Sequence, residues 1–275
     1  MRYTIRRLTT LDDCWQVVAL EKQVWGYTDF EDVVPAAILL ISAKRGGVLL
    51  GAFDENRRMI GFVYALAAMK DGQCTQWSHM LGVLPEAREA GLGAELKREQ
   101  RRVTLQMGIT LIEWTFDPMQ ALNAHLNFAK LGVVAEEYVE NIYGDSSSPL
   151  HRGNPTDRLI ALWKLDAPHV LRRLDRRAVH IRDAGTLDAP VALRAEGDPS
   201  CAQPGRVHTS LGDRRVAVEI PVGFSEMLVN DPPRALAWRV ATREAFSAYL
   251  SRGYRAVDFF LEREKNRGRY LLALP

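Results

Sequence analysis

The segment from Leu81 to Gln100 holds the residues whose types and spacing best suit the binding of a phosphate group. It reads LGVLPEAREAGLGAELKREQ and contains Arg-x-x-Gly-x-Gly at Arg88, Gly91 and Gly93. Apolar residues before this spacing predict a buried strand, and residues rich in Leu, Lys and Glu after it predict a helix. Glycines at such a turn let the backbone approach a bulky anion, and the first N–H groups of the helix point toward it. The turn therefore suggests a cofactor with a pyrophosphate rather than a metal ion.

The spacing alone is weak, and its context gives it weight. Arg-x-x-Gly-x-Gly arises by chance in roughly one chain of this size in fifteen, because glycine makes up about 7% of residues. The segment lacks the Rossmann spacing Gly-x-Gly-x-x-Gly, and no Gly-Lys-Ser/Thr of a Walker loop follows it. An ordinary glycine turn that caps a surface helix is the alternative interpretation.

The elements that would position this turn are predicted from hydrophobic spacing and from Gly and Pro signals. Residues 1–167 predict a first domain of the α+β class, with antiparallel hairpins first and alternating strands and helices after them. Strands are expected at 3–8, 48–53, 59–68, 75–83, 109–116, 133–143 and 159–165, and helices at 12–25, 35–44, 94–107 and 121–131. Thr10 is the expected N-cap of the first helix.

Residues 178–275 predict a second, smaller α+β domain, which follows a connector at 168–177. We expect strands near 178–183, 190–195 and 214–220, a helix at 232–252 and a hairpin at 254–274. The segment AHLNFAKLG (124–132) shares Ala, an aromatic residue and a closing Gly with AFSAYLSRG (245–253). This echo indicates either a partial duplication or two ordinary amphipathic helices that end on glycine.

Composition excludes several classes of function. The chain has 275 residues, with 36 Lys and Arg against 34 Asp and Glu, and its net charge of +2 gives no field that favours nucleic acid. Four arginines between 172 and 177 form a local basic patch, which is typical of a solvated linker or helix face. The 3 cysteines have no metal-ligand spacing and indicate reduced thiols. No apolar run suits a secretory signal or a membrane span, so we expect a soluble cytoplasmic protein.

Over the first 166 or so residues, element order and motifs resemble the GNAT superfamily of acyl-CoA-dependent N-acyltransferases. The segment Arg88 to Gly93 is similar to the pyrophosphate loop of that family, which directly follows the fourth strand. Asn123 and Ala124, with Lys130-Leu131-Gly132 after them, are similar to the family's next conserved helix. The resemblance implies a mixed, mostly antiparallel sheet flanked by helices. The C-terminal domain resembles the family only as a partial repeat.

The resemblance also implies which residues bind acetyl-CoA or another acyl-CoA as co-substrate, with no metal. Leu81, Gly82 and Val83 would offer backbone groups to the pantetheine arm. Arg88, Glu89, Ala90, Gly91, Leu92 and Gly93 would hold the pyrophosphate, and Asn123 would bond the cofactor near its thioester. A gap between the strands at 75–83 and 109–116 would admit the thioester carbon and the amine.

Such a reaction needs a proton acceptor, because an alkyl amine with a pKa near 10.4 is protonated at pH 7 and its deprotonation costs roughly 4–5 kcal/mol. The candidates are His79, Glu113 and Asp117. Each has a structural alternative: His79 as a core histidine, Glu113 as a solvated strand carboxylate, and Asp117 as a helix cap before Pro118.

A proton donor to the leaving thiolate is also expected, and here the sequence departs from the family. The tyrosine expected on the 121–132 helix is Phe128. Tyr143, beside a polar loop, is the preferred replacement and Tyr138 the second; Tyr249 holds the equivalent place in the echo helix. A rim or core aromatic with a bonded hydroxyl is the alternative for each.

The remaining candidates bind substrate. Arg158 would bind a carboxylate in a bidentate manner, or it would form an ion pair with Asp157 that closes the 145–156 loop. Asp117 is a further candidate on the acceptor side. An acceptor with its own carboxylate, or a dicarboxylic acyl group such as succinyl, would suit Arg158 or Arg152.

The sequence therefore predicts an acyltransferase that acts by direct attack on a primary amine of a small metabolite, such as an amino acid. The second domain would cover the acceptor side, and a homodimer is left open. The rival hypothesis is a regulatory or scaffold protein that binds acyl-CoA without turnover, which the loss of the helix tyrosine favours. Acetylation of proteins would need an open peptide groove, against which the second domain argues.

Overall fold

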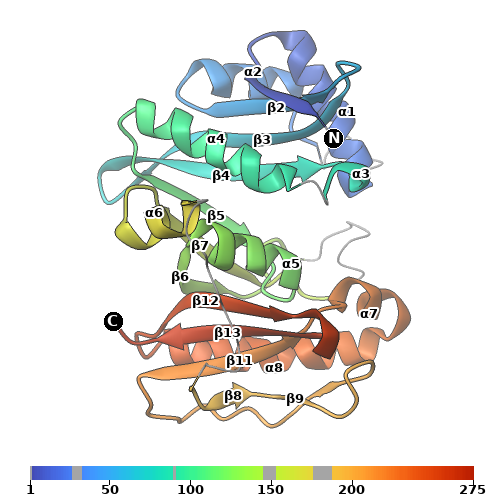
Figure 1. Ribbon diagram of the computed structural model, residues 1–275, viewed down its shortest axis with the longest axis vertical. Helices are drawn as coiled ribbons and strands as arrows, with labels where there is room; N and C mark the ends of the chain where they lie inside the picture. Colours follow the sequence, from blue (N-terminus) through green and yellow to red (C-terminus); the bar gives the residue numbers. More distant parts are fainter. Residues whose placement is uncertain (1, 27–32, 89–90, 145–152, 176–187) are drawn as a thin grey trace. The chain divides into compact units, whose positions relative to one another are not determined.

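The computed structural model of the chain describes residues 2–26, 33–88, 91–144, 153–175 and 188–275. Contacts divide the chain into two compact units, Met1–Trp114 and Thr115–Pro275. The division falls within strand β5 (Leu111–Phe116), inside the segment 1–167 that the sequence predicts as one domain. Each unit contains strands and helices of its own (Figure 1).

The first unit is built on a sheet with the strand order β1-β2-β3-β4-β5. Its strands are β1 (Tyr3–Arg7), β2 (Val48–Asp54), β3 (Met59–Lys70), β4 (Gln73–Val83) and the first part of β5. Neighbours from β1 to β4 are antiparallel, whereas β4 and β5 are parallel. Both faces of β2 are buried, because helices cover the sheet on both sides.

Two groups of helices cover opposite faces of this sheet. These helices are α1 (Leu11–Trp25), α2 (Ala36–Lys44), α3 (Pro85–Arg88) and α4 (Leu92–Gln106). A Cβ on Gly61 would meet Leu92 and Leu96 of α4, while the ring of the next residue, Phe62, lies 5.9 Å from that of Trp25 in α1. Since consecutive strand residues face opposite sides, α4 covers one face and α1 the other.

A bulge in β4 lies where β4 and β5 separate. Tyr64 and Ala65 of β3 pair with Met80 and Ser78, so His79 is the extra residue of the bulge. Within the first unit, β4 pairs with β5 at Gln76–Ile112 and Trp77–Glu113. A bulge strengthens local twist and ends regular pairing. The pairing of β4 with β5 in this unit therefore ends before Ser78, and the gap that the resemblance implies stays a prediction.

The second unit contains the strand order β7-β6-β12-β13-β11-β8. The strands are β6 (Val134–Val139), β7 (Arg158–Lys164), β8 (Val191–Leu193), β11 (Arg215–Pro221), β12 (Arg255–Glu262) and β13 (Arg267–Ala273), with β9 (Ala195–Glu196) and β10 (Gln203–Pro204) in a separate pair. The hairpins β6–β7 and β12–β13 meet where Ala135 of β6 pairs with Ala256 of β12. β11 pairs with β8 in parallel.

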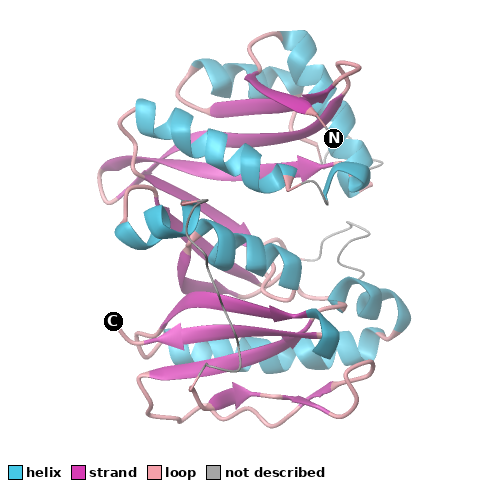
Figure 2. Cartoon of the chain, viewed as in Figure 1, coloured by secondary structure: helices cyan, strands magenta, loops and turns pink. Residues whose placement is uncertain are grey.

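The helices of the second unit are α5 (Ala121–Ala124), a π-helix at His125–Leu131, α6 (Pro168–Leu174), α7 (Phe224–Asn230) and α8 (Pro232–Leu250) (Figure 2). The long helix α8 packs against β6, β8 and β11. Aromatic rings fill the core around Tyr270, whose ring centroid lies 5.6 Å from that of Phe128, 5.1 Å from that of Phe246 and 4.7 Å from that of Phe259.

The order of strand, helix and hairpin occurs twice along the chain. β5, α5 with its π-helix, and β6–β7 come first; β11, α8 and β12–β13 follow. In addition, β5 and β11 each have a parallel neighbour, β4 and β8. This order agrees with the predicted partial duplication, which stays a prediction, as does the division into domains at 1–167 and 178–275.

The α+β class with a mostly antiparallel sheet flanked by helices is confirmed. Thr10 caps α1 as expected, in a capping box with Asp13. The connector at 168–177 contains α6, the helix at 121–131 changes to a π-helix after Ala124, and α7 was not expected. The strand predicted near 178–183 lies outside the described residues. Among the helices that the structure describes, none has the length and apolarity needed to span a membrane.

Candidate functional site

The glycine turn joins the end of β4 to the N-terminus of α4. Gly91 is the N-cap of α4 and has φ 73°, a conformation that residues other than Gly rarely adopt. The N–H groups of Ala94 and Glu95 donate to Gly91 O, so those of Leu92 and Gly93 precede the first bond of the helix. A Cβ built on Gly91 would have no atom within 4 Å. The turn thus leaves two N–H groups outside the bonding of the helix, and the space beside the Cα of Gly91 is open.

Arg88 lies at the start of this turn and is tied to the end of β4. Its Nε donates to Val83 O at 3.1 Å, and its side chain is exposed. At the end of β4, one edge of the strand pairs with β3: Leu81 pairs with Val63, Gly82 with Phe62 and Val83 with Gly61. The structure therefore brings Leu81–Val83, Arg88 and Gly91–Gly93 together, while Glu89 and Ala90 lie outside the described residues.

His79 projects from the bulge of β4 with an exposed side chain, and its imidazole makes an edge contact with the ring of Tyr64 at 6.0 Å. Although the side chain is exposed, protein atoms around the ring exclude part of its hydration. This desolvation lowers the pKa of His79 below its ordinary value. The imidazole is consequently neutral at pH 7 and able to accept a proton.

Glu113 of β5 is occupied by an ion pair. Its carboxylate accepts a hydrogen bond at 2.6 Å from Nζ of Lys70, at the end of β3. The Glu113 side chain is 9% exposed and that of Lys70 is 41% exposed. The register places Glu113 beside Trp77, two residues from His79. A base at this position would first have to release Lys70.

A buried polar cluster lies where β4 and β5 separate, and the sequence did not predict it. Lys97 of α4 donates from Nζ to Ser78 Oγ at 2.8 Å, and Nζ lies 3.8 Å from the centroid of the Trp114 ring. Gln100, one turn further along α4, donates from Nε2 to the same Ser78 Oγ at 3.1 Å. Lys97 is 3% exposed, and this burial lowers its pKa to about 7.

Asp117, in the second unit, is held by an arginine of α8. Arg239 donates from Nη1 and Nη2 to the two carboxylate oxygens at 2.6 and 2.8 Å, and the backbone N–H of Met119 donates to Oδ1. Burial alone would raise the pKa of Asp117, but the Arg239 guanidinium outweighs this effect and holds the pKa below its ordinary value. Asp117 is thus an ion-paired anchor. It does not cap the next helix, which was the structural alternative, because the N-cap of α5 is Gln120 and no side chain caps it.

Tyr138 belongs to a second buried network. Its hydroxyl donates to Asp157 at 2.7 Å, and Arg243 of α8 donates to both oxygens of the same carboxylate at 2.9 and 2.8 Å. Burial, and next to it the charge of Asp157, raises the pKa of Tyr138 far above its ordinary value. Asp157 therefore pairs with Arg243, whereas Arg158 donates to its backbone carbonyl.

Tyr143 and Arg158 lie side by side in the same unit. The Tyr143 hydroxyl is 2.9 Å from Thr115 Oγ1, and its side chain is 53% exposed. The guanidinium carbon of Arg158 lies 5.4 Å from the centroid of the Tyr143 ring. Of Tyr138 and Tyr143, the two tyrosines considered for proton donation, only Tyr143 has an exposed side chain. Arg152, the other arginine considered for a carboxylate, lies outside the described residues.

The helix that follows β5 bears the two remaining positions of interest. Asn123 is exposed on α5. Phe128 is fully buried, and its ring meets that of Phe116 at 5.9 Å and that of Tyr270 at 5.6 Å. Tyr249, at the equivalent place of the echo helix, is buried and donates its hydroxyl to His208 O at 2.6 Å. Neither Phe128 nor Tyr249 therefore offers an accessible proton donor.

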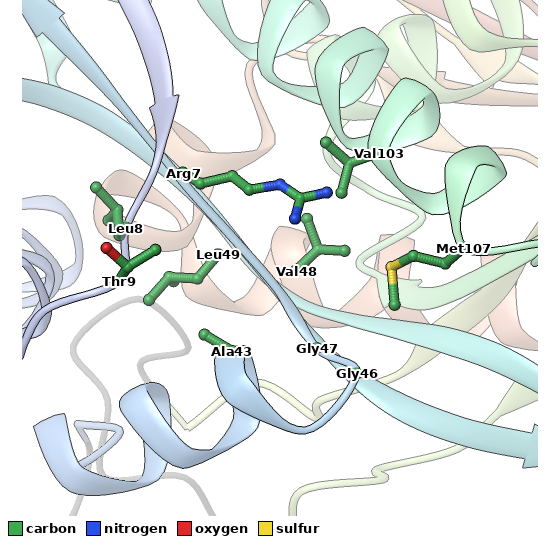
Figure 3. A pocket seen from close by; sticks show the side chains of 10 residues that line it. All are labelled: Arg7, Leu8, Thr9, Ala43, Gly46, Gly47, Val48, Leu49, Val103 and Met107. Atoms are coloured by element: carbon green, nitrogen blue, oxygen red, sulfur yellow. The ribbon is translucent and has the colours of Figure 1, made fainter.

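A cavity of about 190 Å³ lies in the first unit, away from this chemistry. Figure 3 shows the side chains that line it, among them Arg7, which extends toward Val103, and Val48 and Met107. Val103 and Met107 belong to the C-terminal end of α4, whereas the glycine turn lies at its N-terminus. Since an α-helix rises 1.5 Å per residue, roughly 20 Å separate the cavity from the turn. Among the described residues, no cluster of His, Cys, Asp or Glu could hold a metal ion.

Comparisons with known proteins identify the fold of this chain. The chain matches no protein-family model and no curated protein. Among solved structures, a candidate acetyltransferase from Acinetobacter baylyi ADP1 is 16% identical, with a TM-score of 0.50 over 61% of this chain and 94% of that one. The fold is that of the GNAT acetyltransferases. This finding confirms the fold that the sequence resemblance implied.

Two other solved structures are similar with lower TM-scores. A GNAT acetyltransferase from Streptococcus pneumoniae is 19% identical over 58% of this chain and 98% of that chain, with a TM-score of 0.47. The PaiA N-acetyltransferase from Thermoplasma acidophilum, solved with coenzyme A, is 16% identical over 60% of this chain and 99% of that chain, with a TM-score of 0.43.

Proposed function

We propose that this protein is an N-acyltransferase. It moves an acetyl or another short acyl group, succinyl among them, from acyl-CoA to a primary amine of a small metabolite such as an amino acid, by direct attack. The observation that carries this proposal is the open glycine turn at the N-terminus of a 15-residue helix, within a GNAT fold. The proposed enzyme is cytoplasmic, needs no metal, and has a C-terminal domain on the acceptor side.

The described residues of the turn fit the diphosphate of coenzyme A. The space in front of Gly91 is open, and the N–H groups of Leu92 and Gly93 lie at the positive end of the α4 dipole. The exposed Arg88 supplies a full positive charge beside them. Bound there, acyl-CoA would supply an activated thioester. Leu81–Val83 would bond its pantetheine arm, and Asn123 would bond it near the thioester.

His79 and Tyr143 are the proposed acid–base residues. His79 is the better proton acceptor of the predicted set, because Glu113 is paired with Lys70 and Asp117 with Arg239. Its depressed pKa keeps the imidazole neutral at pH 7. Tyr143 is the better donor, because the hydroxyl of Tyr138 is committed to Asp157. Acid–base assistance of this kind accelerates reactions by roughly 10²–10⁴.

Arg158 is the proposed ligand of a substrate carboxylate. It lies next to Tyr143, and burial lowers its pKa, although the nearby Asp117 opposes this effect. A carboxylate on the substrate would form a charge-assisted, bidentate pair with this guanidinium. An acceptor such as an amino acid, or a dicarboxylic acyl group, supplies such a carboxylate.

A regulatory protein that binds acyl-CoA without turnover is the second candidate, favoured by the buried Phe128. Release of CoA thiol from acetyl-CoA and succinyl-CoA, measured with a panel of amines, distinguishes the two. Turnover that depends on the amine supports the enzyme. Tight binding of CoA without thiol release for any acyl group would establish the regulatory protein instead.

A further inference from the structure

Lys97 differs from an ordinary helix lysine in its surroundings. Its ammonium nitrogen lies in the protein interior, 2.8 Å from Ser78 Oγ and 3.8 Å from the centroid of the Trp114 ring. Neither of these contacts, which are the ones seen among the described residues, supplies a negative charge. Burial of an ammonium in such surroundings is costly, and the group reduces this cost by losing its proton.

The position of this amine coincides with the end of the pairing between two strands, where the gap for the thioester is expected. Ser78 is the first residue of β4 after the pairing with β5, and it precedes the bulge at His79. Trp114 follows Glu113, the last paired residue of β5 in the first unit. Lys97 therefore contacts both strands where they separate, and it comes from the helix that begins at the glycine turn.

We propose that Lys97 is a site of self-acylation by bound acyl-CoA. This inference rests on the proposed function, because the acyl donor enters through the same gap. Nζ attacks the thioester carbonyl carbon, and the new C–N bond replaces the C–S bond. The proton lost by the nitrogen passes to the leaving sulfur, so the products are an amide on Lys97 and free CoA thiol.

The consequence of this reaction is regulatory. An amide at Lys97 removes a potential positive charge and places an acyl chain between Ser78 and Trp114. An amide is stable to hydrolysis, so the modified chain would keep this part of the gap filled. Self-acylation would therefore slow later turnovers when acyl-CoA is abundant and the amine acceptor is scarce.

The exposed lysines of the chain serve as internal controls. With the pKa of Lys97 at about 7, close to half of its amine is neutral at pH 7, about a thousandfold more than for an amine with a pKa near 10.4. Lys44, Lys130 and Lys164 are exposed. We expect Lys97 to be acylated at least tenfold faster than any of the three, although it is the least accessible to water.

The experiment is incubation of the full chain with acetyl-CoA in the absence of an amine, followed by denaturing quench and peptide mass mapping. CoA binding is measured by calorimetry on the same sample. Preferential acetylation at Lys97, its loss in Lys97→Arg and its slowing in Ser78→Ala support the proposal. If CoA binds but Lys97 is modified no faster than the exposed lysines, self-acylation alone is overturned. If CoA does not bind, the proposed function and this inference are overturned together.

Discussion

Removal of Arg239 tests whether Asp117 is a structural anchor or a catalytic group. The Arg239 side chain is 1% exposed and that of Asp117 is 11% exposed, and two hydrogen bonds join them at 2.6 and 2.8 Å. In Arg239→Gln, the carboxylate stays buried without a counter-charge. Loss of one partner of a buried pair costs about 3–5 kcal/mol, which corresponds to a fall in Tm of roughly 6–20 °C for a unit of this size.

The pH dependence of stability gives this prediction a second, independent readout. In the wild type, Arg239 holds the pKa of Asp117 below its unfolded value, so its stabilisation is complete above about pH 4 and is lost on further acidification. In Arg239→Gln the folded pKa lies above the unfolded value. The free energy of unfolding of this variant should therefore increase as the pH falls from 7 toward 4.

The assay is urea denaturation followed by circular dichroism, with Glu140→Gln as the matched control. Glu140 is 54% exposed and lies 3.3 Å from Arg243, a surface pair whose loss should cost less than about 1 kcal/mol. The double variant Asp117→Asn/Arg239→Gln should be more stable than the sum of the single costs predicts. If Arg239→Gln cost no more than Glu140→Gln, Asp117 would not be an anchor, and its use as a base would be open again.

Three further predictions concern single side chains. Tyr143→Phe should lower kcat at least tenfold with little change in CoA affinity, whereas Tyr138→Phe should lower stability instead, because Asp157 loses a donor. An unchanged kcat for Tyr143→Phe would place the donor elsewhere. His79→Gln should reduce kcat/KM at least tenfold and remove the acidic limb of its pH profile. In the wild type, the depressed pKa of His79 shifts this limb to lower pH; persistence of the limb in the variant would assign it to another group. Glu21 is fully buried, and burial raises its pKa to about 7. The free energy of unfolding of the wild type should therefore fall by about 3 kcal/mol between pH 4.5 and 7, because the folded state binds the proton of Glu21 more tightly than the unfolded state. Glu21→Gln should abolish this slope in urea titrations, and a retained slope would show that another group causes it.

The elements around the glycine turn could be predicted from sequence because their signals are local. Apolar residues before Pro85, glycines at 91 and 93, and the helix after them lie within one short segment. The bulge at His79 could not be predicted, because a bulge is a mismatch in register with β3, and the sequence of β4 alone does not contain the partner. The same limit applies to the separation of β4 from β5.

Two buried charges were missed although the sequence holds a signal for them. In α8, Arg239 lies in a stripe of buried residues whose other members are small or aromatic: Ala235, Thr242, Phe246 and Tyr249. Helical spacing places it on the buried face, where an arginine needs a carboxylate.

In α4, Lys97 follows the buried Leu96 and lies one turn before Gln100. Its partner Ser78 is on another element, so spacing could indicate burial but not the contact. The ion pair of Asp157 shows the same limit: the adjacent Arg158 was considered as its partner, but Arg243, far along the chain, holds the carboxylate.

Binding of CoA at the glycine turn is the central claim, and a comparison of two glycine variants tests it most directly. Gly91 and Gly108 have φ of +73° and +76°, both have open space for a Cβ, and they lie at opposite ends of α4. Glutamate at either position carries a similar conformational cost of about 1–2 kcal/mol. Only at Gly91 would its charge face the diphosphate, where two unit charges 4 Å apart repel by about 4 kcal/mol at an effective dielectric constant of 20.

Calorimetric titration of CoA should therefore show binding to the wild type and to Gly108→Glu, and at least a hundredfold weaker binding to Gly91→Glu, with the same circular dichroism spectrum for all three. Equal affinity of the two glutamate variants for CoA would contradict the account.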